Sequence, residues 1–409
     1  MKNTLIKTLT LTLMTSSVVY AGGYKIPETS TNGMALGAAN IAHNKSADAA
    51  YYNPANMIFM SDESRLETDL IYIGLSPTKF KGSAEIAGAT IPADISAKSE
   101  NFVLPAINYV SPKLGKTRVG LSISVPGGLS KRWSDSPAKD SAEEFTLEVV
   151  EINPTAAFEL SKNLALGVGF RILYSKGIVK STSLASRDME GESLDYGYNL
   201  ALSYKGDNSL EVAMTYRSNI ALTEMGNAKL KIGNAKVYDG GANVSVPLPA
   251  SINLALAYTL ETKTSIEFVY ERNLWSAYNR LDFGYRSSIP LIIQPSMDAP
   301  IDKNWKDTNT YRLGITQELD AITFMAGVVF DRSPVPDSSL SFELPDSDSI
   351  SVSLGARYKI NDKIDVGIST LYSMRDARSI NSADSNNNLD GKFSNSNVFM
   401  LSAGLGYKF

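Results

Sequence analysis

Several residue types that would support other kinds of protein are absent or scarce in this chain of 409 residues. It has no cysteine, which excludes disulfides, thiol nucleophiles and thiolate metal sites. Its one histidine, His43, does not make a histidine-based metal site by itself. A net charge of −4 and a pI of about 5.4 provide no basic surface for nucleic acid. We therefore expect no metal, no cofactor and no nucleic acid partner.

Long hydrophobic runs are also missing. Beyond the amino-terminal region, no segment has eighteen consecutive apolar residues, which excludes membrane-spanning helices. The amino terminus itself has Lys2 and Lys7, then an apolar stretch to Val19, then small residues before Gly22. This order is typical of a secretory signal peptide, so residues 1–21 are predicted to be removed after Ala21. The alternative is a membrane anchor, but the stretch is short and contains several threonines.

The last twelve residues, Val398 to Phe409, alternate in character. Large apolar side chains occupy one face of the predicted strand, and small or polar ones occupy the other. The first face consists of Phe399, Leu401, Ala403, Leu405, Tyr407 and Phe409, and the second includes Ser402, Gly404, Gly406 and Lys408. This pattern suits a closed barrel with lipid outside and water inside. A terminal Phe409 further predicts a closing strand in the bacterial outer membrane, recognised by barrel-assembly machinery.

The same alternation recurs along the chain, for example in residues 164–174, 210–217, 322–330, 350–359 and 364–372. Charged residues such as Arg171 fall opposite the large apolar face, as expected when a lipid-facing Arg or Lys costs about 2–4 kcal/mol at the bilayer midplane. A soluble β-sandwich alternates too, but explains neither the long strands with glycines on the polar face nor the aromatic last residue. Counting from Arg65, we predict an all-β, transmembrane antiparallel β-barrel of about fourteen strands, over residues 63–409.

Two kinds of connection separate the strands. Residues 161–163, 205–208 and 360–363 are short and are predicted to be periplasmic turns. Residues 128–144, 281–308 and 375–397 are longer and polar, and are predicted to be extracellular loops. The last of them is expected to be solvent-facing and mobile around residues 381–388.

Residues 22–62 lack strand alternation and are rich in Ala, Gly, Asn and Ser, with scattered apolar residues. They are too many for a tail and too few for a domain. We interpret them as a hatch that plugs the lumen, where small side chains allow close approach to the wall. A disordered periplasmic extension is the alternative, and the apolar content argues against it. His43 is expected to be a hydrogen-bonding group of this hatch.

Two stretches carry a resemblance to a known family. Residues 29–42 with 46–57, which include Asn53, Pro54 and Ala55, and residues 331–348 resemble the FadL-type outer membrane transporters of long-chain fatty acids and their TodX-type hydrocarbon-channel relatives. The resemblance spans nearly the whole mature chain. It implies a monomeric fourteen-stranded barrel closed by a hatch, an external apolar capture patch, an internal pocket and a lateral opening in the wall. An interruption at residues 124–128 is a candidate for that opening.

The expected substrate-binding residues fall into two groups. In the regions that correspond to the family's capture loops, residues 126–144 and 181–194 are short, and Leu129, Trp133 and Phe145 are expected to form a small apolar lip. For the pocket, strand parity suggests Arg171 and Arg312 as cations for a carboxylate. The resemblance adds Arg217, Lys303 and Lys306. The alternative for each cation is a structural ion pair.

The function expected from these observations is passive uptake of long-chain fatty acids or similar hydrophobic molecules, with outer-membrane lipid around the barrel. A channel for neutral aromatic or aliphatic hydrocarbons is the alternative on the same fold, and the short loops favour it mildly. An outer-membrane lipase or protease is not expected, because the one histidine lies in the hatch. A general diffusion porin is not expected either, because of the hatch.

Overall fold

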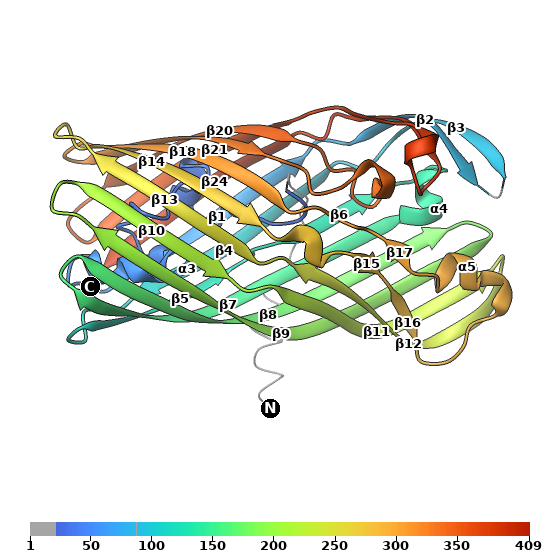
Figure 1. Ribbon diagram of the computed structural model, residues 1–409, viewed down its shortest axis with the longest axis horizontal. Helices are drawn as coiled ribbons and strands as arrows, with labels where there is room; N and C mark the ends of the chain where they lie inside the picture. The colour runs from blue at the N-terminus through green and yellow to red at the C-terminus, as the bar shows by residue number, and fades with distance from the viewer. Residues whose placement is uncertain (1–21, 87) are drawn as a thin grey trace.

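The wall of the protein is one closed antiparallel β-sheet. A computed structural model describes residues 22–86 and 88–409, so the predicted signal peptide lies outside the described residues. Among the described residues, fourteen strands form the ring (Figure 1), and two of them are broken into collinear pieces, β10 with β11 and β12 with β13. A third, β5 with β6, is interrupted for three residues. The predicted all-β barrel and its strand number are confirmed.

The wall strands in chain order are β1 (Arg65–Leu75), β4 (Glu100–Val110), β5 (Thr117–Ser124), β6 (Gly128–Arg132), β7 (Glu144–Ser161), β8 (Leu164–Thr182), β9 (Ala185–Lys205), β10 (Leu210–Arg217), β11 (Ile220–Ile232), β12 (Ala235–Leu248), β13 (Ser251–Thr259), β14 (Thr264–Asn273), β18 (Thr308–Glu318), β19 (Ile322–Asp331), β20 (Ser349–Lys359), β21 (Ile364–Arg375) and β24 (Val398–Lys408). A short strand, β16 (Phe283–Tyr285), extends the sheet beside β12.

The first and last strands close the ring. β1 and β24 pair along their whole length, from Arg65↔Lys408 to Leu75↔Val398. On β24 the side chains of Phe399, Leu401 and Leu405 are exposed and the alternate ones are buried. The outward face of the wall is therefore apolar, as the alternation predicted, and the closed seam excludes a two-sheet sandwich.

Connections at the two ends of the barrel differ in length. The three predicted turns are confirmed: β7–β8, β9–β10 and β20–β21 are joined by two to four residues at the end that holds Phe409 (Figure 1). At the other end, residues 128–144 are not all loop, since they contain β6 and the helix α4 (Ala138–Ala142). Residues 281–308 contain β15 (Arg280–Leu281), β16, η3 (Leu291–Ile293), α5 (Gln294–Met297) and β17 (Ile301–Asp302), and η2 (Trp275–Ala277) precedes them.

The long connection after β21 contains short strands and a helix that were not predicted, although residues 381–388 are mostly solvent-facing, as expected. β22 (Arg378–Ile380), η5 (Ser382–Asp384) and β23 (Leu389–Ser394) lie within it. β23 pairs with the hairpin β2 (Lys79–Ile86) and β3 (Ala89–Ser96) to make a separate four-stranded sheet. Its core includes Phe393, which is 2 % exposed and packs 4.7 Å from the Phe80 ring. This sheet was not predicted where a solvent-facing loop was expected, because its strands are short and pair with a distant hairpin. The remaining short helix here is η4 (Asp337–Ser339).

Residues 22–60 lie inside the ring (Figure 1). They contain three short helices, α2 (Thr31–Ala35), α3 (Ala49–Tyr52) and η1 (Pro54–Phe59), whose residues are almost all buried. Wall glycines allow the close approach: a Cβ at Gly167 would lie 2.4 Å from the Ala55 nitrogen, and one at Gly327 would lie 2.3 Å from the Leu36 carbonyl carbon. Within residues 22–86 and 88–409, no helix has the length and apolar character needed to cross a membrane.

Candidate functional site

The third wall strand is broken beside the amino-terminal segment. The ladder between β4 and β5 runs from Val110↔Gly120 to Ile107↔Ile123 and ends there, and β6 pairs with β7. Residues 125–127, the wall break, pair instead with residues 24–26: Ile26 N donates to Pro126 O, and Gly128 N donates to Tyr24 O, both at 2.9 Å. The amino-terminal segment thus fills the wall break from inside.

An aromatic cluster fixes this segment. The Tyr24 ring lies 4.9 Å from the Trp275 ring and 5.9 Å from the Trp305 ring, and its hydroxyl donates to Pro247 O. Gly23 precedes it with φ +79°, and a Cβ there would lie 2.4 Å from Trp275. Gly23 N also donates to Asp346, 3.3 Å away in the loop after β19. Because the segment has so many partners, it is held in one place against the wall.

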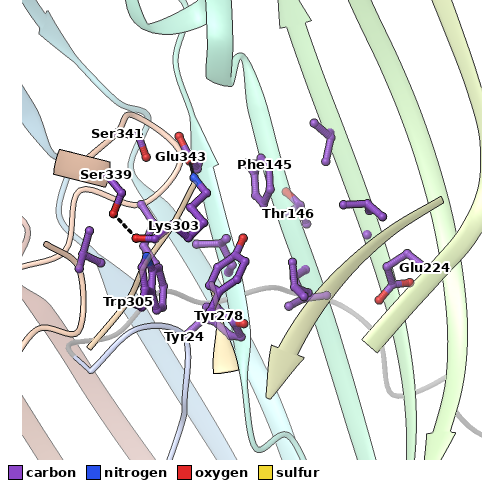
Figure 2. A pocket seen from close by; sticks show the side chains of 18 residues that line it. Tyr24, Phe145, Thr146, Glu224, Tyr278, Lys303, Trp305, Ser339, Ser341 and Glu343 are labelled. Carbon is purple, nitrogen blue, oxygen red and sulfur yellow. Dashed lines mark hydrogen bonds and ion pairs between the residues drawn. The ribbon is translucent and has the colours of Figure 1, made fainter. Parts of the chain in front are cut away.

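A largely apolar cavity, the inner cavity, opens next to Tyr24 (Figure 2). It contains about 570 Å³ of space that no atom occupies, a volume that includes open solvent. Its apolar lining comes from Tyr24, Leu129, Phe145, Leu147, Val179, Val244, Val246, Tyr278, Trp305, Val335 and Leu344. Its ionisable groups are Lys303, Glu343 and Glu224. Such a cavity favours a hydrocarbon chain over an ion.

A larger cavity, the mouth cavity, lies between the long connections and contains about 2,330 Å³ of space that includes open solvent. It shares Phe145, Val179, Ser341 and Glu343 with the inner cavity, so the two adjoin at these side chains. Ile292 lines it while 81 % exposed, and Leu291 beside it is equally exposed. The molecule therefore presents apolar surface to water directly above the inner cavity.

Lys303 and Lys306 lie in different surroundings. Lys303 is 3 % exposed, lines the inner cavity and forms an ion pair with Glu343. Burial opposes ionisation of Glu343, but Lys303 holds the pKa of that carboxyl below its usual range. Lys306 is exposed and is not part of the lining of the cavities described above. Lys303 alone of this pair is positioned to meet a bound molecule.

The three predicted arginines meet in a third space, the hatch cavity, between the wall and residues 25–52. Each has a carboxylate partner. Arg171 Nη2 lies 2.8 Å from Glu151, Arg217 pairs with the same Glu151, and Arg312 Nη2 lies 2.8 Å from Glu271. Two of them also donate to hatch carbonyls, Arg217 to Tyr51 O and Arg312 to Gly37 O. This geometry favours the structural ion pairs that the sequence left as the alternative.

Asn53, Pro54 and Ala55 form the start of η1 and are fully buried against β8 and β9. Asn53 Nδ2 donates to Ile41 O at 2.7 Å and to Ser203 Oγ at 2.8 Å, while its Oδ1 caps η1 by accepting from Ala55 N. Proline at the first helical position loses no hydrogen bond there. The three residues therefore join the hatch to itself and to the wall.

Further contacts come from Glu267 on β14, which accepts hydrogen bonds from three successive backbone N–H groups, those of Ile41, Ala42 and His43, at 2.7–2.9 Å. The His43 ring lies 3.1 Å from Glu211 and 3.1 Å from Ser265 Oγ, as a hydrogen-bonding group should. Charged wall side chains thus satisfy backbone groups that a short irregular segment leaves unpaired.

The predicted apolar lip points inward. Leu129 and Phe145 line the inner cavity. Trp133 is 1 % exposed, and its indole donates to Phe342 O at 2.9 Å, so it packs in the core below the mouth cavity and forms no external lip. Sequence reasoning placed these residues in loops, whereas Leu129 and Phe145 lie on paired strands, β6 and β7.

The cavity residues that were missed include Tyr24, Tyr278, Trp305 and Glu224. The first three belong to irregular segments, where alternation gives no direction for a side chain. The alternation around Glu224 was a usable signal, since it follows Leu222 at strand spacing and faces away from the exposed Met225.

Comparisons with known proteins agree with this architecture. A family model described as outer membrane protein transport protein (OMPP1/FadL/TodX) matches residues 12–409. The chain is 25% identical over 417 residues to a long-chain fatty acid transport protein of Escherichia coli (strain K12), covering 87% of this chain and 89% of the relative. It is 23% identical over 425 residues to outer membrane protein P1 of Haemophilus influenzae (strain ATCC 51907 / DSM 11121 / KW20 / Rd), covering 88% of each.

Solved structures show the same fold. A Pseudomonas aeruginosa FadL homologue superposes with a TM-score of 0.82 at 18% identity, covering 94% of this chain and 99% of that one. The Pseudomonas putida toluene transporter TodX superposes with a TM-score of 0.71 at 14% identity, covering 96% and 99%. At these identities the likeness establishes the barrel and leaves the substrate open.

Proposed function

Because the chain belongs to the outer membrane protein transport family (OMPP1/FadL/TodX), we propose that it takes up long-chain fatty acids or similar hydrophobic molecules passively across the outer membrane. The observation that carries the proposal is the position of the inner cavity: an apolar space that adjoins the mouth cavity on one side and the Tyr24 segment, over the wall break, on the other.

The physical problem for such a substrate is water. Each methylene buried from water is worth about 0.8 kcal/mol, so a long acyl chain gains nothing from a wet pore. In the proposed route the exposed Leu291 and Ile292 first capture the molecule, which then passes Phe145 into the inner cavity. Displacement of residues 24–26 next opens the wall break toward the lipid. Each stage replaces one apolar contact by another.

A second candidate, a channel for neutral hydrocarbons, is favoured by one observation. Lys303 already has Glu343 as its partner, and the three arginines have Glu151 and Glu271. A fatty acid carboxylate would have to displace Glu343 or share Lys303 with it. A neutral molecule meets no such competition.

Passage by this route makes and breaks no bond, and we propose that the protein is not an enzyme. Ester or peptide hydrolysis by the purified protein would contradict this. We also propose that residues 22–62 act as the movable hatch, that the barrel works as a monomer in outer-membrane lipid, and that assembly machinery recognises the last strand through Phe409.

A disulfide across the wall break tests the route, and the cysteine-free chain makes the result easy to assign. Lys25 and Gly127 form an antiparallel pair flanked by the two hydrogen bonds of residues 24–26. The Cα atoms of such a pair are ~4.5 Å apart, which lies inside the disulfide range of ~4.4–6.8 Å. The double variant K25C/G127C should therefore cross-link the segment to the wall.

Uptake of a labelled long-chain fatty acid is measured in cells that rely on the variant. We expect oxidised K25C/G127C to stop uptake and reductant to restore it. Lys25 forms an ion pair with Glu271 at 2.5 Å, and a Cβ at Gly127 would lie 2.9 Å from Tyr24 O. The single variants, K25C and G127C, control for these two changes. Equal uptake by the oxidised and reduced forms would reject a route through the wall break.

A further inference from the structure

Glu224 on β11 lies in the inner cavity, across from Lys303 and Glu343 (Figure 2). It is 1 % exposed. Its Oε1 lies 2.6 Å from Ser175 Oγ, while its Oε2 has no hydrogen-bond partner among residues 22–86 and 88–409. Within the part of the chain that the structure describes, it forms no ion pair. A buried carboxyl oxygen without a partner is costly, by ~1–3 kcal/mol, and needs an explanation.

The wall is shaped to hold this side chain. Gly177 on β8 and Gly191 on β9 are directly opposite each other, and Glu224 lies over both. A Cβ on Gly177 would be 3.2 Å from Glu224 Cγ, and a Cβ on Gly191 would be 3.2 Å from Glu224 Cβ. Any other residue at either position would crowd Glu224. Two facing glycines thus leave room for Glu224 at the edge of an otherwise apolar space.

The number of protons available for hydrogen bonding decides whether the Glu224 carboxyl is neutral or ionised. A chain of hydroxyl and carboxyl oxygens runs from Glu224 to Ser175 (2.6 Å), on to Ser193 (2.7 Å), and ends at Asp195 (2.6 Å). Three hydrogen bonds need three protons, but the two serines supply one each. One carboxyl must supply the third. Glu224 is the more deeply buried of the two, so it is the one kept neutral by burial.

With its proton directed at Ser175, Glu224 lines the cavity with its Oε2 left as a buried, neutral acceptor. A hydrocarbon leaves this oxygen unpaired. A carboxylate brings no donor to it, and an ammonium ion finds no negative charge there. A hydroxyl group satisfies it with one hydrogen bond.

We propose that Glu224 is a specificity-determining residue of the inner cavity, which binds neutral hydrocarbon chains that carry a hydroxyl group by accepting a hydrogen bond from that hydroxyl. This rests on the proposed uptake function and names the substrate class for the same cavity. Lys303 remains paired with Glu343 at the other end, so the ligand needs no charge.

Four twelve-carbon probes test the assignment: 1-dodecanol, n-dodecane, dodecanoate and dodecylamine. Binding to the purified full chain is followed by quenching of tryptophan emission, since Trp305 lines the cavity. The variants are E224M, which removes the acceptor, and E224Q, which keeps it without the possibility of a charge. E190Q is the matched control, because Glu190 is an exposed carboxylate on the neighbouring β9, paired with Lys176.

For the wild type we expect dodecanol to bind about tenfold or more tightly than dodecane. E224M should abolish that preference while it still binds dodecane, which also reports an intact cavity. E224Q should keep the preference to within about threefold, and E190Q should behave as wild type. If E224M does not insert into the membrane, G177V is used in its place, because a valine at this position on β8 crowds Glu224.

Other outcomes distinguish the proposed role of Glu224 from the proposed uptake function. Equal binding of dodecanol and dodecane by the wild type, or an unchanged preference in E224M, would overturn the role of Glu224 and leave uptake standing. Tightest binding of dodecylamine, lost in E224Q, would mean a charged carboxylate and would also overturn it. Saturable binding of none of the probes would reject the proposed uptake function itself.

Discussion

At the scale of single residues, Gly23 holds the amino-terminal segment at a position open only to glycine. Its φ of +79° and the 2.4 Å from an ideal Cβ to Trp275 both exclude a side chain. We expect G23A to cost about 1–3 kcal/mol of local stability and to move Tyr24 out of the aromatic cluster. Tryptophan emission should then shift to longer wavelength, because Trp275 and Trp305 lose their cover.

Gly115 provides the control for this variant. It also has a positive φ, +65°, but nothing lies within 4 Å of its ideal Cβ. G115A should therefore bring backbone strain without the emission change. Identical spectra for G23A and wild type would show that Gly23 does not set the position of the segment.

Glu28, in the amino-terminal segment just before the hatch helix α2, gives a pH dependence. Burial raises its pKa to about 7 against the opposing charge of Arg312, with Asp331 and Glu271 nearby. Since this native pKa lies above the usual 4.5, Glu28 favours the folded state at low pH, and that contribution is lost as the pH rises from about 4.5 to about 7. The loss is on the order of 2–3 kcal/mol.

The free energy of unfolding measured at pH 5 and pH 8 checks this. E28Q should reduce the fall in stability between the two values, and Asp48, whose pKa burial also raises to about 7, should account for part of the remainder. An E28Q protein with the full wild-type fall would mean that Glu28 is ionised in the fold throughout.

At the scale of elements, polar groups of the wall and of the hatch attach the two to each other. N53A removes the donors to Ile41 O and Ser203 Oγ and the cap of η1. We expect it to lower the protection of backbone amides in residues 41–60 by about 1–3 kcal/mol, as measured by hydrogen exchange. Protection in β8 and β9 should not change.

Asn227 on β11 is exposed, and N227A serves as the control. A uniform loss of protection across hatch and wall in N53A would show that the two unfold as one unit. In that case the hatch would not be free to move within an intact barrel.

The elements also show how far sequence reasoning reaches in this fold. Alternation placed Leu401 and Leu405 outside and Arg171 inside because a strand in a membrane wall must be apolar on one face along its whole length. It did not place Trp133 or Lys306, because neither lies on a long strand and nothing in their neighbours fixes the direction of the side chain. The sheet of β2, β3, β22 and β23 was missed because its pairing joins segments about 300 residues apart.

The site was predictable to a smaller degree. Strand parity found the inward cations Arg171 and Arg312, but it did not reveal that Glu151 and Glu271 would neutralise them. Glu224 shows the same limit. Parity predicts that its side chain points inward, but not that one of its oxygens is unpaired, because that depends on Gly177 and Gly191 from two other strands.

At the scale of the whole molecule, the mouth cavity includes open solvent and adjoins the inner cavity. Leu291 and Ile292 are each 81 % exposed at its edge. We expect L291S/I292S to slow uptake from dilute solution severalfold, while affinity at the inner cavity, measured by tryptophan quenching, stays unchanged.

The exposed Leu184, at the β8–β9 turn and also part of the mouth lining, gives the matched control L184S. An equal loss in L184S would assign capture to the whole rim. No loss in either variant would mean that molecules reach the inner cavity by a way that bypasses the mouth.

The seam between β1 and β24 separates two ways of placing the hatch. The hatch precedes every wall strand in the chain, and the ring that surrounds it is complete only when the last strand pairs with the first. A hatch that packs on the inner wall before the seam forms is enclosed when the strands pair, whereas a hatch left outside has to enter through an end of the finished barrel.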